Sequence, residues 1–181
     1  MPRLGFAAVW IVLLWIPNVG AQQSGWDKHV IYEGARTMTA VAADVTGDGL
    51  PDVIADSDKK TRLWIAPDWT EVILDDHPQV ETYIHSECFD VDGDGDLDYI
   101  GARYKPGLIV WLEQPENSAA GRWHRRIADD SVHGIHGLIK GDVDGDGNTE
   151  LLATSAQAMP PYPESLAWFR VPEDPRTAKR W

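Results

Sequence analysis

The sequence is poor in cysteine and in basic residues. Cys88 is its only cysteine, so no disulfide can form within the chain, and we expect this residue to be a small buried strand residue. Lys and Arg number 16 against 29 Asp and Glu, which gives a net charge of −13. Because nucleic-acid binding needs a basic face, nucleic acid is excluded from the expected partners. Stability must come from packing and bound ions.

Amphipathic stretches at helical spacing are also missing, and the longest apolar run is short. Residues 4–16 are almost wholly apolar, follow Arg3 and end before Pro17. This run is shorter than the ~20 residues that span a bilayer, so we expect no stable membrane anchor. A basic start, an apolar stretch and small residues before Ala21 are typical of a secretory signal. We therefore predict a signal peptide at residues 1–21, cleaved after Ala21, and a secreted or periplasmic mature chain.

The sequence does contain three acidic loops. Residues 90–98 read Asp-Val-Asp-Gly-Asp-Gly-Asp-Leu-Asp, and residues 44–52 and 142–150 repeat the same glycine phase. Carboxylates this close repel one another unless a cation lies among them. Hard oxygen ligands in this number suit Ca²⁺, and the glycines allow the positive φ angles that wrap a backbone around an ion. We predict that all three loops bind Ca²⁺.

The expected ligands occupy positions 1, 3, 5, 7 and 9 of each loop, with the backbone carbonyl acting at position 7. These positions hold Asp44, Thr46, Asp48, Leu50 and Asp52 in the first loop, Asp90, Asp92, Asp94, Asp96 and Asp98 in the second, and Asp142, Asp144, Asp146, Asn148 and Glu150 in the third. The first loop has one carboxylate fewer at positions 1, 3, 5 and 9. We therefore expect the second loop to bind Ca²⁺ most tightly and the first loop most weakly.

An EF-hand is the obvious alternative, and two features exclude it. Position 12 of an EF-hand loop should be a bidentate Glu, but the three loops have Ala55, Gly101 and Ala153 there. EF-hand loops lie between helices, whereas the segments that flank these loops are short and apolar, like strands. Each loop is therefore predicted to connect two strands.

A longer repeat surrounds each loop, with one Trp-initiated strand before it and a second Trp-bearing strand after it. The first kind is expected at 26–31, 69–73 and 123–127, and the second at 63–65, 109–112 and 166–169. The repeating units span about 26–68, 69–122 and 123–180. Four short strands per unit at this spacing are typical of β-propeller blades, in which we expect the tryptophans to fill the space between neighbouring sheets.

The predicted fold class is therefore all-β, with about three four-stranded propeller blades. Residues 179–181, Lys-Arg-Trp, match Gly-Arg-Trp at 121–123, where the third unit opens. A propeller needs about 4–8 blades to close. We expect the chain to be an incomplete piece of a larger propeller. The alternative is that copies of the chain close one ring together, and the uncovered terminal blades would then cause self-association.

The three loops and their flanking strands resemble the FG-GAP/VCBS repeat family, which includes the propeller of integrin α chains. The resemblance rests on Asp-Val-x-Gly-Asp-Gly-x-x-[Asp/Glu] in each loop and covers roughly residues 26–181 of the predicted propeller region, 22–181. It implies a seven-bladed propeller in complete members, with Ca²⁺ in the hairpin loops. The Phe-Gly…Gly-Ala-Pro signature of integrin blades is absent, so integrin-type ligand binding is not implied. The Trp strands are more similar to bacterial exported VCBS proteins and to the propeller of aldos-2-ulose dehydratase.

Three histidines are the other candidates for chemistry. His85 and His136 stand five and six residues before their loops, and His133 lies just ahead of His136. If the starts of inner strands line a central channel, these histidines could bind Zn²⁺ or act as acid and base on a sugar; alternatively they hydrogen-bond turns.

Two functions follow. We favour a non-catalytic, calcium-stabilised binding or scaffold module with a protein or carbohydrate ligand. The alternative is part of a carbohydrate-active lyase or hydrolase that uses these histidines.

Overall fold

The computed structural model describes residues 25, 27–77 and 82–181, so the signal peptide predicted at 1–21 lies outside the described residues. The chain divides into two units, Met1–Val30 and Ile31–Trp181, and all the described strands belong to the second unit. In the part of the chain that the structure describes, no helix is long and apolar enough to cross a membrane.

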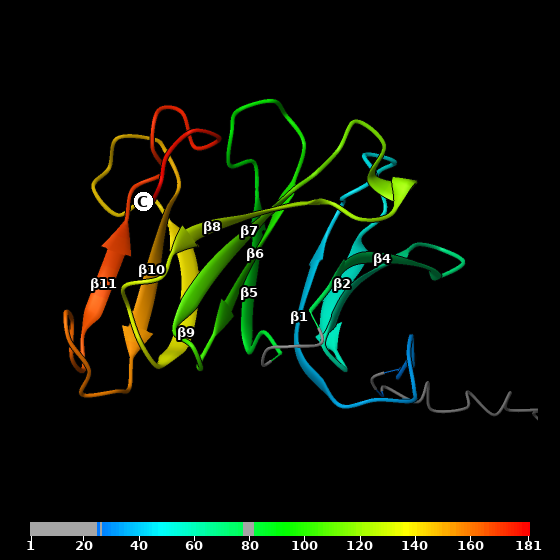
Figure 1. Ribbon diagram of the computed structural model, residues 1–181. Coiled ribbons are helices and arrows are strands. Elements are labelled where there is room, and N and C mark those ends of the chain that lie inside the picture. The colour runs from blue at the N-terminus through cyan, green and yellow to red at the C-terminus, as the bar shows by residue number, and fades with distance from the viewer. Residues whose placement is uncertain (1–24, 26, 78–81) are drawn as a thin grey trace, which may run out of the picture. The chain divides into compact units, whose positions relative to one another are not determined.

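The described residues form three antiparallel sheets, in each of which the strands follow one another in chain order (Figure 1). The first sheet contains β1 (Thr37–Ala43), β2 (Asp52–Ser57), β3 (Lys60–Ile65) and β4 (Thr70–Asp76). The second contains β5 (His85–Phe89), β6 (Asp98–Arg103), β7 (Leu108–Glu113) and β8 (His124–Asp129), and the third β9 (Ile135–Gly141), β10 (Glu150–Ser155) and β11 (Leu166–Phe169). A single 3₁₀ turn, η1 (Ser118–Ala120), is the only helical element among these residues. The predicted all-β fold with propeller-like sheets is confirmed.

Each acidic loop connects the first two strands of its sheet, as predicted. The three loops join β1 to β2, β5 to β6 and β9 to β10, and each pair is antiparallel. Strands rather than helices flank the loops because the neighbouring segments are too short for a helix and bury alternate apolar side chains in a sheet.

Neighbouring sheets pack on one another through two apolar clusters. Side chains alternate along a strand, so each face of the second sheet contributes to a different cluster. Tyr99 and Leu112 pair across β6 and β7 and belong to the cluster shared with the first sheet. Ile100 and Trp111, the next pair, belong to the cluster shared with the third sheet. We call these the preceding face and the following face of a sheet.

The Trp-initiated strands belong to different sheets from those expected. β4 pairs with β3 and β8 pairs with β7, so each strand completes the sheet of the loop before it. The sheets run over 37–76, 85–129 and 135–169, one strand out of step with the units expected from the sequence. The strand expected at 26–31 is also corrected, because residues 27–31 form none. A repeat in sequence cannot assign a strand to the sheet before it or after it, because pairing is a contact between distant residues.

Two of the loop-following tryptophans occupy equivalent places in their sheets. Trp111 pairs with Ile100 and Trp168 pairs with Leu152, so both lie on a following face. Trp111 is fully buried against the third sheet, as predicted for a side chain between sheets. Trp168 is 46% exposed, so the expected burial is wrong for this residue. The third sheet has no following sheet among the described residues.

Trp64 lies on the opposite face of its sheet. It pairs with Val53, is buried, and stacks against Tyr32 with ring centroids 5.1 Å apart. Trp64 follows the first Asp of its loop by 20 residues, whereas Trp111 follows its own by 21. Its partner Val53 follows that Asp by 9 residues, whereas Ile100, the partner of Trp111, follows its own by 10, so side-chain alternation places the two rings on opposite faces.

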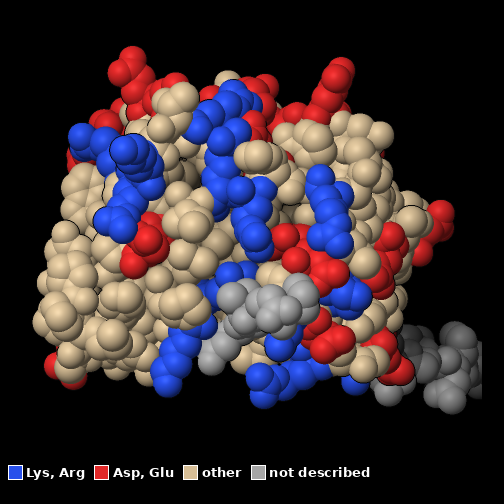
Figure 2. Space-filling model, in the orientation of Figure 1, with Lys and Arg blue, Asp and Glu red and all other residues tan. Residues whose placement is uncertain are grey.

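Charged side chains of both signs lie side by side on the face shown in Figure 2. Two ion pairs join the first and second sheets. Arg125 contacts Asp75 at 3.4 Å, and Arg122 contacts Asp76 at 3.4 Å. Both aspartates end β4, so these pairs tie the outer strands of neighbouring sheets together.

Candidate metal-binding loops

The glycines of each loop adopt the conformation predicted for them. Gly93 and Gly95 have φ angles of 78° and 98°, which place them in the left-handed region that favours glycine. No heavy atom lies within 4 Å of an added Cβ at either position. The glycines are therefore required by the backbone conformation, and crowding does not explain them.

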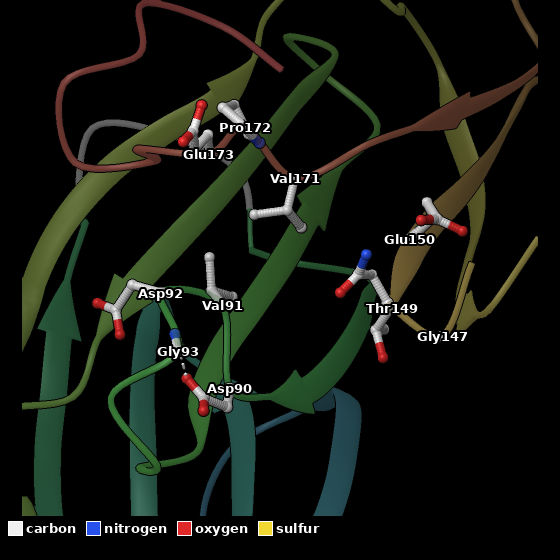
Figure 3. A pocket seen from close by; sticks show the side chains of 11 residues that line it. Asp90, Val91, Asp92, Gly93, Gly147, Thr149, Glu150, Val171, Pro172 and Glu173 are labelled. Atoms are coloured by element: carbon white, nitrogen blue, oxygen red, sulfur yellow. Dashed lines mark hydrogen bonds between the residues drawn. The ribbon is translucent and has the colours of Figure 1, made fainter.

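The aspartate at position 1 holds the loop in its wrapped shape. Asp90 Oδ1 accepts a hydrogen bond from the N–H of Gly93 at 2.8 Å (Figure 3), and Oδ2 accepts from the N–H of Gly95 at 3.0 Å. The third loop repeats both bonds, and in the first loop Asp44 accepts from Asp48 and Gly49. This side chain organises the backbone whether or not an ion is bound.

The carboxylate at position 9 points into the protein and closes the base of the loop. Asp98 is 2% exposed, and its two oxygens accept hydrogen bonds from the N–H groups of Val91 at 3.1 Å and Gln114 at 2.7 Å. Asp52 makes the same pair of bonds in the first sheet, to Val45 and Ala66. The structure thus places these predicted ligands on backbone N–H groups.

Glu150, at position 9 of the third loop, makes one of these two hydrogen bonds. Its Oε2 accepts from the N–H of Val143 at 2.8 Å, while its Oε1 is buried and has no hydrogen-bond partner. Burial raises the pKa of Asp98 to about 7, against the lowering effect of the N–H groups of Gln114 and Val91. The buried carboxylate at position 9 is therefore a structural element at the base of each loop.

The side chains at positions 1, 3 and 5 gather at the outer side of the loop. Carboxylate oxygens of Asp90, Asp92 and Asp94 all lie within 4.8 Å of one another, and those of Asp142, Asp144 and Asp146 do the same. The residues at positions 7 and 9 do not belong to either group. Three carboxylates at this spacing can hold a divalent cation.

Position 3 provides an independent sign of a ligand. The side chain of Asp92 is 2% exposed, and its Oδ1 is buried without a hydrogen-bond partner, while Arg176 lies against Oδ2. Burial and the charge of Asp94 raise the pKa of Asp92, and the charge of Arg176 opposes them in part. At the same position in the first loop, Thr46 Oγ1 is also buried without a partner. Buried oxygens of this kind are normally satisfied, and a cation held by the loop could satisfy them.

Two arginines from the end of the chain contact these carboxylates. Arg176 Nη2 lies 2.6 Å from Asp92 Oδ2 and 3.2 Å from Asp94 Oδ2, while its Nε lies 2.6 Å from Glu113. Arg170 pairs with Asp144 in the third loop. The sequence analysis missed both arginines, because they lie far from the loops along the chain and belong to no motif.

The second and third loops line one hollow together (Figure 3). Asp90 to Gly93 form one side, Gly147 to Glu150 another, and residues 171–173 lie against both. Figure 3 shows the side chains of Asp90 and Asp92 on one side of the hollow and those of Thr149 and Glu150 on the other. A ligand in this hollow would touch two loops at once.

The structure brings two of the three candidate histidines together. The rings of His85 and His136, at the starts of β5 and β9, have centroids 6.1 Å apart, and Tyr104 lies 6.1 Å from His136. Burial, and then the neighbouring His136, lower the pKa of His85. His133 is held in the turn before β9, where its carbonyl oxygen accepts a hydrogen bond from Ser155 Oγ.

Comparison with known proteins finds a family likeness over part of the chain. The family model of the FG-GAP-like repeat matches residues 90–153, which hold the second and third loops and the strands between them. No curated protein and no solved structure gives a significant match. The match confirms an FG-GAP-like repeat in this part of the chain, at the level of the repeat itself.

Proposed function

We propose that this protein is an exported, calcium-binding β-propeller module that serves as a binding or scaffold module. The observation that carries the proposal is the carboxylate of Asp92, whose Oδ1 is buried without a hydrogen-bond partner and which lies beside two further carboxylates. Export is supported by the signal-like residues 1–21, and an extracellular space supplies the Ca²⁺ that loops without a position-12 Glu require.

Different positions of each loop have different roles in holding the ion. Asp90, Asp92 and Asp94 supply side-chain oxygens, and the carbonyl at position 7 completes the outer side of the loop. Asp98 keeps the loop closed through its backbone N–H bonds. The bound ion supplies positive charge that offsets the mutual repulsion of the carboxylates and fixes the strand connection. Ca²⁺ thus contributes stability to each sheet.

The hollow between the second and third loops is the proposed ligand site. Carboxylates and backbone groups of both loops line it, together with Val171 and Pro172. Hydroxyls of a carbohydrate or a carboxylate of a protein partner can reach metal-bearing loops from this side. A protein or carbohydrate ligand is therefore proposed, with no covalent chemistry.

Titration calorimetry on the purified chain tests the calcium proposal. We expect Ca²⁺ binding that Asp92→Asn weakens at least ~10-fold, because ligand charge tunes such sites over orders of magnitude. Asp96→Asn is the matched control, since position 7 is proposed to act through its backbone carbonyl and should change affinity much less. Absence of binding heat, together with an unchanged melting temperature in Ca²⁺, would contradict the proposal.

The pair His85 and His136 supports a second candidate function. Their rings lie at one end of adjacent inner strands beside Tyr104, where they could act as acid and base on a sugar. Activity on a panel of polysaccharides, abolished by His136→Ala and retained by His124→Ala on the exposed start of β8, would establish a carbohydrate-active enzyme. No turnover on any substrate leaves the binding module as the function.

A further inference from the structure

Gln114 and Val171 occupy equivalent positions in the second and third sheets. Gln114 stands two positions after Leu112, which pairs with the residue that follows the second loop. Val171 stands two positions after Phe169, which pairs with the residue that follows the third loop. Both are followed by a proline and then by a glutamate. The two residues are therefore counterparts in neighbouring sheets.

Gln114 makes two hydrogen bonds at this position. Its backbone N–H donates at 2.7 Å to Asp98, the carboxylate at position 9 of its own loop. Its side-chain Nε2 donates at 3.2 Å to the carbonyl oxygen of Val45, at position 2 of the loop before. Because Gln114 is buried, its carboxamide lies packed between the second sheet and the first loop.

Val171 replaces neither of these bonds. Glu150 is the carboxylate at position 9 of the third loop, and its Oε1 is buried without a hydrogen-bond partner. Val91 is the counterpart of Val45, and its carbonyl oxygen receives no amide from this position because a valine side chain has no donor. Val171 thus leaves two acceptors, Glu150 Oε1 and the Val91 carbonyl, without the donors that Gln114 supplies in the second sheet.

The residues that carry these two acceptors line the hollow between the second and third loops, on opposite sides of it (Figure 3). Among the described residues that line the hollow, none is Lys or Arg, and the acidic ones are Asp90, Asp92, Glu150 and Glu173. The larger apolar ones are Val91, Val171 and Pro172. A ligand suited to this lining donates hydrogen bonds, carries positive charge and offers apolar surface.

A primary ammonium group on a short apolar stem meets all three requirements. It has three N–H donors and no acceptor, and a hydrogen bond from an ammonium to a carboxylate is stronger than one between neutral groups. The alkyl stem of such a ligand packs on apolar surface while the charged end stays among polar groups. A carboxylate brings no donor, and a neutral hydroxyl does not offset the negative charge of the lining.

We infer that the hollow binds a primary ammonium group on an apolar stem, such as the side chain of a lysine in a partner protein, and that Val171 determines this specificity. The inference rests on the hollow being the ligand site proposed above, and it narrows the ligand to one chemistry. It does not depend on an ion in the loops, because Glu150 lies outside the carboxylate groups that can hold a cation. Free alkyl amines have the same chemistry, so the experiment compares both sources.

An NMR titration of the isotope-labelled chain with n-butylammonium, in the presence of Ca²⁺, gives the first test. We expect shifts at the residues that line the hollow. n-Butanol has the same stem without charge, and butyltrimethylammonium has the charge without N–H donors, so both should bind at least ~10-fold more weakly. Equal binding of n-butanol, or shifts confined to other parts of the chain, would overturn the inference.

A second titration separates the two sources of the ammonium group. The probe is lysine with its α-amino and carboxyl groups blocked as amides, which leaves only the side-chain ammonium. Tighter binding of this probe than of n-butylammonium supports a lysine of a protein partner as the ligand. Equal affinity supports a free amine with the same chemistry.

Val171→Gln tests the determinant itself, because it introduces the carboxamide that Gln114 carries in the second sheet. We expect this variant to bind n-butylammonium at least ~10-fold more weakly and to keep the wild-type heat of Ca²⁺ binding. Val171→Ala is the matched control, since it adds no amide and should retain ammonium binding. Glu150→Gln keeps the shape of the side chain without its charge and should also weaken binding. Circular dichroism shows whether each variant is folded.

Wild-type ammonium affinity in folded Val171→Gln or in folded Glu150→Gln would overturn the inference. Calorimetry with Ca²⁺ keeps this result apart from the calcium proposal. Ca²⁺ binding without ammonium binding would overturn the present inference alone, and ammonium binding without Ca²⁺ binding would contradict the calcium proposal alone.

Discussion

The backbone N–H of Trp181 donates a 2.8 Å hydrogen bond to the carbonyl oxygen of Ala128 at the end of the second sheet. The N–H of Trp123 donates in the same way, at 2.9 Å, to Leu74 at the end of the first sheet. The residue before each tryptophan repeats the relationship, since Arg180 pairs with an aspartate after β8 as Arg122 pairs with one at the end of β4. Residues 122–123 therefore contact the end of the first sheet in the same way as residues 180–181 contact the end of the second.

Removal of Arg176 should strengthen Ca²⁺ binding in the second loop. The guanidinium contacts Asp92 and Asp94 and must leave before an ion can enter. An ion pair made by an exposed arginine contributes little, so Arg176→Ala should raise affinity by about fivefold at most. Calorimetry measures this change, with Arg180→Ala as a control that contacts no loop. Weaker binding in Arg176→Ala would show that the arginine supports the site.

Asp98→Ala should destabilise the protein in the presence and in the absence of Ca²⁺. The substitution leaves the N–H groups of Val91 and Gln114 buried without an acceptor, at about 1–3 kcal/mol each. Urea unfolding in Ca²⁺ and in EDTA measures the loss. Asp92→Ala should differ, because it lowers stability in Ca²⁺ only. Equal calcium dependence in the two variants would place Asp98 among the ligands that matter most.

Cys88 should be inert in the folded protein. Burial raises the pKa of its thiol to about 12, and the nearby Lys140 only partly opposes this effect. Because the thiolate is the reactive form, modification at pH 8 should be at least ~1,000-fold slower than in the unfolded chain. Absorbance with a thiol reagent, with and without denaturant, measures both rates. Rapid modification of the native protein would contradict the buried position in β5.

Stability should fall as the pH drops below about 6.5, in part because of His85. Burial and His136 lower the pKa of His85 in the folded state. The unfolded chain therefore binds a proton first, so the contribution of His85 is complete above its unfolded pKa and is lost below it. The free energy of unfolding between pH 7 and pH 5 should fall less steeply in His85→Gln. His124→Gln, at an exposed position, should keep the wild-type slope.

The acidic loops and their flanking strands could be predicted because their signals are local. Alternating carboxylates, paired glycines and short apolar neighbours all lie within one stretch such as 85–103, and no distant contact is needed to interpret them. The opposite faces of Trp64 and Trp111 could not be predicted from their spacings of 20 and 21 residues from the loops, because a hairpin turn lies between each loop and its Trp. The spacing decides the face only together with the length of the hairpin turn, since Trp168 follows its loop by 26 residues and still lies on the same face as Trp111.

The role of each carboxylate could not be read from the motif in the same way. Asp92 and Asp98 belong to the same alternating pattern, yet Asp92 lies among other carboxylates and Asp98 accepts two backbone hydrogen bonds. Gln114, a donor to Asp98, belongs to the end of a different strand. Only the folded chain brings the two together.

The sequence by itself determined the loops, the strand content and the repeat of Arg-Trp at 122–123 and 180–181, because each depends on neighbouring residues. The tertiary structure alone decided that β4 and β8 complete the sheets before them, that Arg176 reaches the second loop, and that Trp168 lies on an open face. These are contacts between residues far apart in the chain. Strand pairing and ion pairing at such distances depend on which surfaces meet when the sheets pack, and no local pattern carries that information.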